Sequence, residues 1–551
     1  GSGLKLAAGV DDTVGSLVLG GVLQTTIGTY GSSTSGANVQ NDEYFSGNGV
    51  IRITALPSDM TWIHANANND WSTTATNWAA GVGWVQNGNA IFAGTGEAVE
   101  LDAPVMVRNM TFNVNGYTIA DTNANGRLIL SGTPSAVSVA NAGETATITD
   151  VIEGTGGLRK QGEGTLKLSG ANSPATGNTL VEAGILYWGA TNALPSGSVT
   201  VQAGATVDLG TQTDVSQNAR AYTIAGTGTS GQGALIKTGA GSVMSANGIN
   251  GLTLSADATI GGSSRADLGG YIDLNGHVLT KVGVNSMPFR TSNIQDSSAG
   301  IVINQGHIYL ENLNFTIEGP VVVNSGGTLG TYVNTGGSNT FNMPIQLNDG
   351  GRLWTAGPNP AGTSTFAGTI ACSGTTYLYT GYNGSAGPYA GDMIVNSTLS
   401  GSGTLILNDT AMGVSGAATR TITFNAANPF SGAIRVERGT LAVSGTGSVN
   451  GCSEINIASN AVVDIQNAGD TLSEAATIVI ANDANSGTGM TLADGMAERV
   501  SKLVLGGATY GNGSGSFGSS TSTADHKLDE YFSGTGILTT PPPDGTIIMV
   551  F

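Results

Sequence analysis

The sequence predicts an all-β protein built as a β-solenoid, and three observations lead to this class. Gly accounts for 86 of the 551 residues, yet the chain is 39% hydrophobic. Short runs in which apolar and polar residues alternate, such as TLKLSG and SVTVQAG, stand between Gly, Asn and Ser, a pattern typical of strands joined by tight turns. Units of a turn and a strand recur about every 20–25 residues, which indicates coils stacked in a solenoid.

The charge balance is acidic, with 38 Asp and Glu against 19 Lys and Arg and a net charge of −19. Nucleic acid is therefore not an expected partner, because binding to phosphates needs a basic surface. Insertion into a membrane is not expected either, since no apolar run reaches the roughly 18 residues that would span one. The low content of charged residues, 10%, together with abundant Ser, Thr, Asn and Gly, suits an exported surface protein.

The first element along the chain is a module that occurs again near the end. DEYFSGNGVIRIT, which begins at Asp42, matches DEYFSGTGILTT, which begins at Asp529, at an offset of 487 (529 − 42). SLVLGG recurs as KLVLGG, and GTYGSSTS recurs as GSFGSSTS. We therefore expect residues 1–55 to form a short β module and residues 490–540 to form its near-duplicate.

A Trp-rich segment, residues 56–130, follows the first module and is expected to form an entry cap. Its aromatic cluster consists of Trp62, Trp71, Trp78 and Trp84. The preferred interpretation is an apolar plug packed around one end of the solenoid. The alternative is a platform on which the rings of a glycan stack.

Residues 131–489 are predicted to form the solenoid coils. VEAGILYWGA, which begins at Val181, is followed 20 residues later by VQAGATVDLG, which begins at Val201. Gly and Asn supply the positive φ needed at corners, and the alternating Val, Leu and Ile side chains point inward and stack in columns. Cys372 and Cys452 lie in this segment, either as one disulfide or as two buried free thiols.

The end of the chain, residues 541–551, is predicted to be a proline spacer followed by a terminal strand. Three prolines give a stiff extended stretch without backbone donors. The uncharged, β-prone run after them consists of Thr546, Ile547, Ile548, Met549, Val550 and Phe551. This run either folds back on its own chain or is donated to a neighbouring subunit by β-strand addition. In the second case, its residues form the predicted subunit interface.

The repeats resemble a known family. The stretch GTGGLRKQGEGTLKLSGANSPATGNTLVEAGILYWG, residues 154–189, resembles the autotransporter-associated β-strand repeat of bacterial surface proteins, and a looser copy covers residues 400–443. The Trp-rich segment resembles the opening that often precedes such repeats, and the DEYFSG module resembles the segment that closes them. The resemblance implies a right-handed parallel β-helix that is exported to the cell surface or beyond it. Between Asp214 and about Ile370 the match is one of style alone.

No enzyme chemistry is predicted. The histidines, His64, His277, His307 and His526, are scattered, and no Ser/His/Asp or paired-carboxylate arrangement follows from spacing. DTNANG, residues 121–126, begins like a calcium loop, but the twelfth position is Gly132 in place of the bidentate Glu, so a plain turn is preferred. We expect no catalytic residue, no metal and no cofactor.

The expected function follows from the two ends of the solenoid. An uncovered end exposes unpaired backbone groups, and head-to-tail contacts that do not close produce filaments. The sequence therefore favours an extracellular or cell-surface structural subunit that self-assembles head-to-tail into a homopolymer. One alternative is a monomeric adhesin that binds glycans, and another is a polysaccharide-degrading β-helix enzyme. A further alternative is that the chain is one period of a longer tandem protein.

Overall fold

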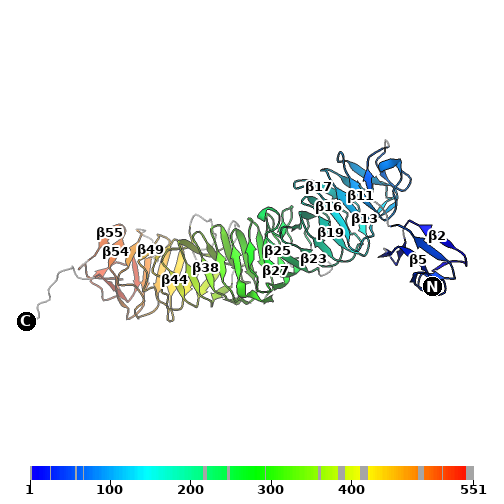
Figure 1. The fold of residues 1–551 in the computed structure, drawn as a ribbon. Helices are drawn as coiled ribbons and strands as arrows, with labels where there is room; N and C mark the ends of the chain where they lie inside the picture. Colours follow the sequence, from blue (N-terminus) through cyan, green and yellow to red (C-terminus); the bar gives the residue numbers. More distant parts are fainter. Residues whose placement is uncertain are drawn as a thin grey trace, which may run out of the picture. The chain divides into compact units, whose positions relative to one another are not determined.

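A computed structural model describes residues 3–540 except 16, 21, 25, 56–58, 66–67, 215–219, 245–247, 292, 335, 358–361, 382–390, 410–419, 482–488 and 512. The predicted interface run Thr546–Phe551 lies outside the described residues. The chain divides into two compact units, Gly1–Ala266 and Asp267–Phe551 (Figure 1), and each unit is described by itself. Among the described residues, no helix is long and apolar enough to cross a membrane.

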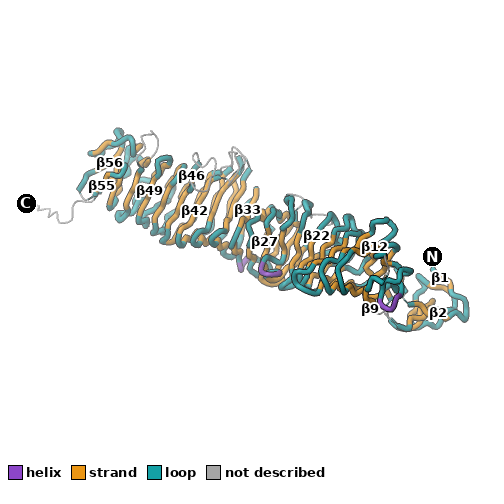
Figure 2. The backbone as a smooth tube through the Cα atoms, turned by 90° about the horizontal axis from the view of Figure 1, so that it is seen from above, coloured by secondary structure: helices purple, strands orange, loops and turns teal. Residues whose placement is uncertain are grey.

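Strands dominate both units (Figure 2), and most of them pair in parallel, which confirms the predicted all-β solenoid. In the solenoids, most strands pair with a strand one coil further along the chain. In unit 1, Thr179 lies opposite Val199, 20 residues later, whereas in unit 2 Ile370 lies opposite Leu399, 29 residues later. The coils are therefore less uniform in length than the sequence repeats predict.

Unit 1 begins with an N-terminal module and continues as a solenoid that already includes the Trp-rich segment. The strands of the module are β1 (Leu4–Lys5), β2 (Asp11–Val14), β3 (Val18–Leu19), β4 (Val22–Leu23), β5 (Gly28–Gly31), β6 (Val39–Gln40), β7 (Phe45–Ser46) and β8 (Val50–Ile53). The strands of the solenoid are β9 (Asp59–Trp62), β10 (Asp70–Trp71), β11 (Gly88–Phe92), β12 (Ala98–Leu101), β13 (Pro104–Phe112), β14 (Thr118–Ala120), β15 (Arg127–Leu130), β16 (Ser135–Val139), β17 (Thr145–Ile148), β18 (Ile152–Glu153), β19 (Leu158–Gln161), β20 (Thr165–Leu168), β21 (Thr179–Val181), β22 (Ile185–Trp188), β23 (Val199–Val201), β24 (Thr206–Asp208), β25 (Tyr222–Gly226), β26 (Leu235–Lys237) and β27 (Ile249–Gly262). Short 3₁₀ turns stand at η1 (Ala79–Gly81) and η3 (Thr229–Gly231).

Unit 2 is a solenoid followed by a C-terminal module. The strands of the solenoid are β28 (Leu268–Asp273), β29 (Leu279–Lys281), β30 (Ser286–Phe289), β31 (Ile294–Gln295), β32 (Ile301–Ile303), β33 (Gly306–Glu311), β34 (Phe315–Thr316), β35 (Val321–Val323), β36 (Gly327–Tyr332), β37 (Ser338–Asn342), β38 (Ile345–Leu347), β39 (Arg352–Ala356), β40 (Thr363–Phe366), β41 (Ile370–Cys372), β42 (Thr375–Thr380), β43 (Asp392–Val395), β44 (Leu399–Gly401), β45 (Thr404–Leu407), β46 (Thr421–Phe424), β47 (Ala433–Val436), β48 (Gly439–Val443), β49 (Glu454–Ile457), β50 (Ala461–Ile465) and β51 (Thr477–Ile480), with the 3₁₀ turn η5 (Ser297–Ala299). The strands of the module are β52 (Gly489–Leu492), β53 (Ala497–Arg499), β54 (Lys502–Leu505), β55 (Ala508–Tyr510), β56 (Ser516–Gly518), β57 (His526–Lys527), β58 (Phe532–Gly534) and β59 (Ile537–Thr539).

Apolar side chains form columns along the solenoid interior, as the alternating strands predict. Leu166, Leu186, Val207 and Leu235 occupy matching register positions on β20, β22, β24 and β26, and all four are fully buried. Burying each such side chain contributes about 1.5–3 kcal/mol. Between β21 and β22 the chain turns at Gly184 with φ +64°, where a Cβ atom would meet the backbone of the preceding coil.

Buried lysines complete the turns at the ends of several strands. The Lys160 ammonium is buried and donates to the carbonyls of Gln161 at 2.8 Å, Gly162 at 2.7 Å and Ala183 at 3.0 Å. In unit 2, Lys281 binds three turn carbonyls in the same way. The three N–H donors of one ammonium therefore satisfy the carbonyls of an entire corner.

Candidate functional site

The Trp cluster lies inside the first coils of unit 1. Trp62, Trp71, Trp78 and Trp84 are between 0 and 3% exposed. The Trp78 ring lies 5.2 Å from that of Trp62 and 4.7 Å from that of Trp84, and Trp71 contacts both Trp78 and Trp84. A glycan-stacking platform needs an exposed ring face, and in this structure the faces of these rings are covered by one another and by Phe92.

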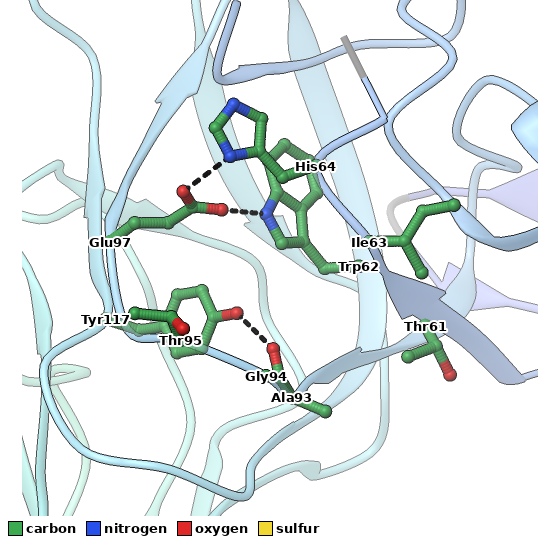
Figure 3. Close-up of a pocket in the computed structure, with 9 residues that line it drawn as sticks. All are labelled: Thr61, Trp62, Ile63, His64, Ala93, Gly94, Thr95, Glu97 and Tyr117. Carbon is green, nitrogen blue, oxygen red and sulfur yellow. Dashed lines mark hydrogen bonds and ion pairs between the residues drawn. The ribbon is translucent and has the colours of Figure 1, made fainter. Parts of the chain in front are cut away.

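A pocket opens beside this cluster, at the ends of β9 and β11. Its volume is about 460 Å³, and it is lined by Thr61, Trp62, Ile63, His64, Ala93, Gly94, Thr95, Glu97 and Tyr117 (Figure 3). Pockets of this volume hold small ligands. We take this pocket as the candidate functional site.

Glu97 organises the pocket by binding two neighbours at once (Figure 3). One of its carboxylate oxygens accepts the Trp62 indole N–H at 2.6 Å, and the other lies 2.8 Å from His64 Nδ1. His64 has φ +48°, a left-handed conformation that side-chain-bearing residues seldom adopt, and this turn directs its ring toward Glu97. The two bonds hold the indole edge and the imidazole in fixed positions at the pocket wall.

Tyr117 forms the opposite wall and is held neutral. Its hydroxyl donates to the Ala93 carbonyl at 2.5 Å. Burial, together with the negative charge of Glu97, raises the pKa of Tyr117 to about 12. The ring is therefore a fixed, uncharged surface at neutral pH.

The lining of the pocket is largely uncharged. Glu97 is the one carboxylate among its described lining residues, whereas hydrolysis of glycosidic bonds ordinarily uses a pair. Its remaining polar groups, such as the Thr61 and Thr95 side chains, suit a small neutral ligand that bears hydroxyl groups. The sequence did not indicate this pocket, because Glu97 lies 35 residues from Trp62 and no motif links them.

The other histidines do not join this site. His307 is partly buried and packs against Trp354, with ring centres 5.2 Å apart, and desolvation, together with the nearby charges of Lys281 and Arg352, lowers its pKa to about 4. His526 stacks on Phe517 in the C-terminal module. In the described part of the chain, no three His, Cys, Asp or Glu side chains are grouped so as to hold a metal ion.

The two cysteines of unit 2 are buried free thiols, which decides between the two alternatives left open by the sequence. Burial raises the pKa of Cys372 to about 11 and that of Cys452 to about 12. Both groups therefore remain protonated at neutral pH and behave as small apolar side chains.

The DTNANG stretch in unit 1 forms a turn rather than converging on a cation. The Asp121 carboxylate accepts the backbone N–H of Asn125, four residues later, at 3.2 Å. This loop joins β14 to β15.

Fold and repeats together define a passenger-like parallel β-solenoid. The chain contains two copies of the passenger-associated-transport-repeat, at residues 158–187 and 414–443, which confirms the resemblance to autotransporter-associated repeats. The chain is also 26% identical over 496 residues to the adhesin BmaC autotransporter of Brucella suis biovar 1 (strain 1330). That similarity covers 83% of this chain, and the chain spans 13% of the length of the Brucella protein. No solved structure matches the chain.

Proposed function

We propose that this chain is a segment of the surface-exposed passenger of an exported bacterial adhesin-like protein. The similarity to an adhesin autotransporter over 83% of the chain carries this proposal. The two passenger-associated repeats and the coil-on-coil architecture support it. In this role the solenoids form the stalk that holds binding surfaces away from the cell, without catalysis.

The pocket of Trp62, His64, Glu97 and Tyr117 is the proposed point of ligand contact. Its volume of about 460 Å³ and its polar lining suit one sugar unit of a neutral glycan. The His64–Glu97 pair and the Trp62 N–H are engaged with one another, so the walls are rigid before a ligand arrives.

A glycan array probed with the purified full chain tests this assignment. Thr95 is exposed at the pocket rim, so Thr95→Trp fills the opening and should reduce binding to neutral glycans at least tenfold. Thr211→Trp, at an exposed turn elsewhere in unit 1, is the matched control and should bind as the unaltered chain does. Equal binding by all three proteins would reject the pocket as the contact point.

Head-to-tail self-assembly stays a prediction from the sequence. Its proposed interface, Thr546–Phe551, lies outside the described residues. The observation that favours it is the presence of near-duplicate modules at both ends of the chain. Strand donation by the terminal run would join such ends by β-strand addition.

A further inference from the structure

The N-terminal module and the C-terminal module have the same internal bonding. In the first, the Ser33 N–H donates to Asp42 Oδ1 at 2.7 Å, and in the second the Ser520 N–H donates to Asp529 Oδ1 at 2.6 Å. β1 pairs with β7 as β52 pairs with β58, and β2 pairs with β8 as β53 pairs with β59. The modules are therefore two copies of one structure, and a contact made by one predicts a contact for the other.

The C-terminal module is joined to the last coil of its solenoid through two strand edges. The second edge of β52 pairs with β50, and the second edge of β54 pairs with β51. Four further backbone N–H groups of the module donate to this coil: Ala493 to Ile465 at 2.9 Å, Ser501 and Lys502 to Ala476 at 3.0 and 3.3 Å, and Gly506 to Ile480 at 3.0 Å. The module thus covers the end of the solenoid with a continuous parallel ladder.

The matching edges of the N-terminal module are open. In the described part of the chain, β1 pairs with β7 alone and β3 with β4 alone. Leu4 is 50% exposed, whereas Met490, at the corresponding position, is 1% exposed. Leu19 is partly exposed, whereas Leu505 is buried. The N-terminal module therefore presents apolar side chains where its copy buries them against a coil.

A charged position shows the same difference between the two modules, buried in the C-terminal one and exposed in the N-terminal one. Glu498 is buried, and its carboxylate accepts the backbone N–H groups of Thr471 at 2.8 Å and Leu472 at 3.5 Å. The N-terminal module carries Asp12 at this position, and its side chain is exposed. A carboxylate is thus available to accept the N–H groups of a coil that is laid on this face.

We infer that the face formed by β1, β3 and Asp12 covers the last coil of another parallel β-solenoid, one that precedes this module in a longer polypeptide. A second copy of this chain does not supply that coil, because its own β50 and β51 are already paired with its C-terminal module. The relative found by sequence is several times longer than this chain, since the chain spans 13% of it, so successive solenoids fit within such a protein. The inference extends the proposed passenger role but does not depend on adhesion or on any ligand.

A module swap tests the inference on the full chain. Residues 489–540 are replaced by residues 3–53, and amide hydrogen exchange is followed in β50 and β51, whose sequences are unaltered. In a chain that lacks 489–540, these amides should exchange at least about tenfold faster than in the intact chain, because the coil loses its cover. In the module-swapped chain, the amides of β50 and β51 should exchange within about threefold of their rate in the intact chain.

Three outcomes would overturn the inference. The amides of β50 and β51 could exchange as fast in the module-swapped chain as in the deletion chain, or they could exchange as slowly in the deletion chain as in the intact one. Within the swapped-in module, Asp12→Ala should speed amide hydrogen exchange at Thr471 and Leu472. Glu43→Ala, which changes an exposed acid away from this face, should not. Equal amide exchange rates in the two variants would count against the assigned face.

The source of the coil is tested separately by sedimentation of the intact chain over a range of concentrations. Leu4→Asp should leave the sedimentation profile unchanged at every concentration, because a second copy does not occupy this face. Concentration-dependent dimers that Leu4→Asp abolishes would identify a second copy as the occupant and contradict a preceding solenoid. Neither result bears on glycan binding, so this inference and the proposed function can fail independently.

Discussion

At the scale of single residues, polar side chains with several hydrogen-bond partners hold neighbouring segments of the chain together. Glu97 joins Trp62 and His64, which makes one wall of the pocket a fixed surface. Lys160 satisfies three carbonyls at one corner of a coil. Each group has neighbours that would be left without a partner if it were removed, and such losses cost more than the net value of the bond.

The Glu97→Gln substitution should weaken the pocket wall slightly. The amide oxygen can still accept the Trp62 N–H, but the second carboxylate oxygen, which lies 2.8 Å from His64 Nδ1, is lost. Both side chains are partly exposed, at 38% for His64 and 21% for Glu97, so solvent screening limits the loss in unfolding free energy of unit 1 to less than about 1 kcal/mol. Denaturant unfolding measures it, with Glu43→Gln as a control that should be neutral; a loss above about 2 kcal/mol would show that Glu97 does more than brace this wall.

Lys160 should make stability depend on pH in the alkaline range. Burial lowers its pKa from the ordinary 10.5 to about 7. Between these values the unfolded chain binds a proton that the folded chain does not, so stability rises with pH from about 7 toward 10.5, by at most about 1.4 kcal/mol per pH unit. Below pH 7 both states are protonated and this contribution is constant.

The Lys160→Met variant tests this dependence. Unfolding midpoints of both proteins are measured between pH 7 and 10. The rise of the unfolding midpoint with pH should be smaller in the variant than in the unaltered chain. Lys281, with its pKa also near 7, should account for a similar share of that rise. Parallel pH profiles for the variant and the unaltered chain would mean that the Lys160 ammonium titrates near its ordinary pKa.

At the scale of elements, neighbouring coils are fitted to one another by residues at matching register positions. Tyr309, Gly330 and Trp354 follow one another on β33, β36 and β39. The absence of a side chain at Gly330 allows the two rings to approach to 5.5 Å between centres. The backbone at this glycine does not need positive φ, so its role is to leave room.

Gly330→Ala should therefore destabilise unit 2 by steric conflict. The added Cβ would lie 2.7 Å from Trp354 Nε1 and still closer to the Tyr309 ring, both of which are buried. Overpacking of this kind costs about 1–3 kcal/mol. Thermal unfolding should show the loss, whereas Gly469→Ala, which has open space around it, should leave the midpoint unchanged; equal midpoints would show that the rings move apart at no cost.

The elements also show how far sequence reasoning reaches. The repeat near residues 158–187 was recognisable because its turns need glycines and its strands alternate strictly. The stretch from Asp214 to about Ile370 matches the repeat family in style alone, yet its described residues form the same coils, because stacking needs inward apolar residues and permissive corners rather than one motif. The pocket could not be predicted, since Trp62, Glu97 and Tyr117 meet through coil stacking, which the spacing of single residues does not reveal.

At the scale of the whole molecule, the chain is a series of coils with related modules at its two ends. The C-terminal module shows what such a module does, since it pairs with β50 and β51 and covers their edges. The parallel ladders of each unit make the coils mutually dependent, because most strand edges within a coil are satisfied by the neighbouring coils.

Deleting residues 541–551 tests the sequence-based prediction of self-assembly. If Thr546–Phe551 joins subunits, the intact chain should form head-to-tail polymers in negative-stain micrographs, and the shortened chain should be a folded monomer. A circular dichroism spectrum with unchanged strand content serves as the control for folding. Polymers of the same length from both proteins would reject strand donation by this run.

Surface location is the central claim, and protease accessibility on intact cells tests it most directly. Bacteria that carry the native gene are treated with proteinase K, and this chain is followed with an antibody against it, beside a cytoplasmic protein as a control for lysis. We predict that the antibody signal on intact cells is lost while the cytoplasmic protein survives. A chain that remains protected until the cells are broken open would contradict its role as an exported passenger.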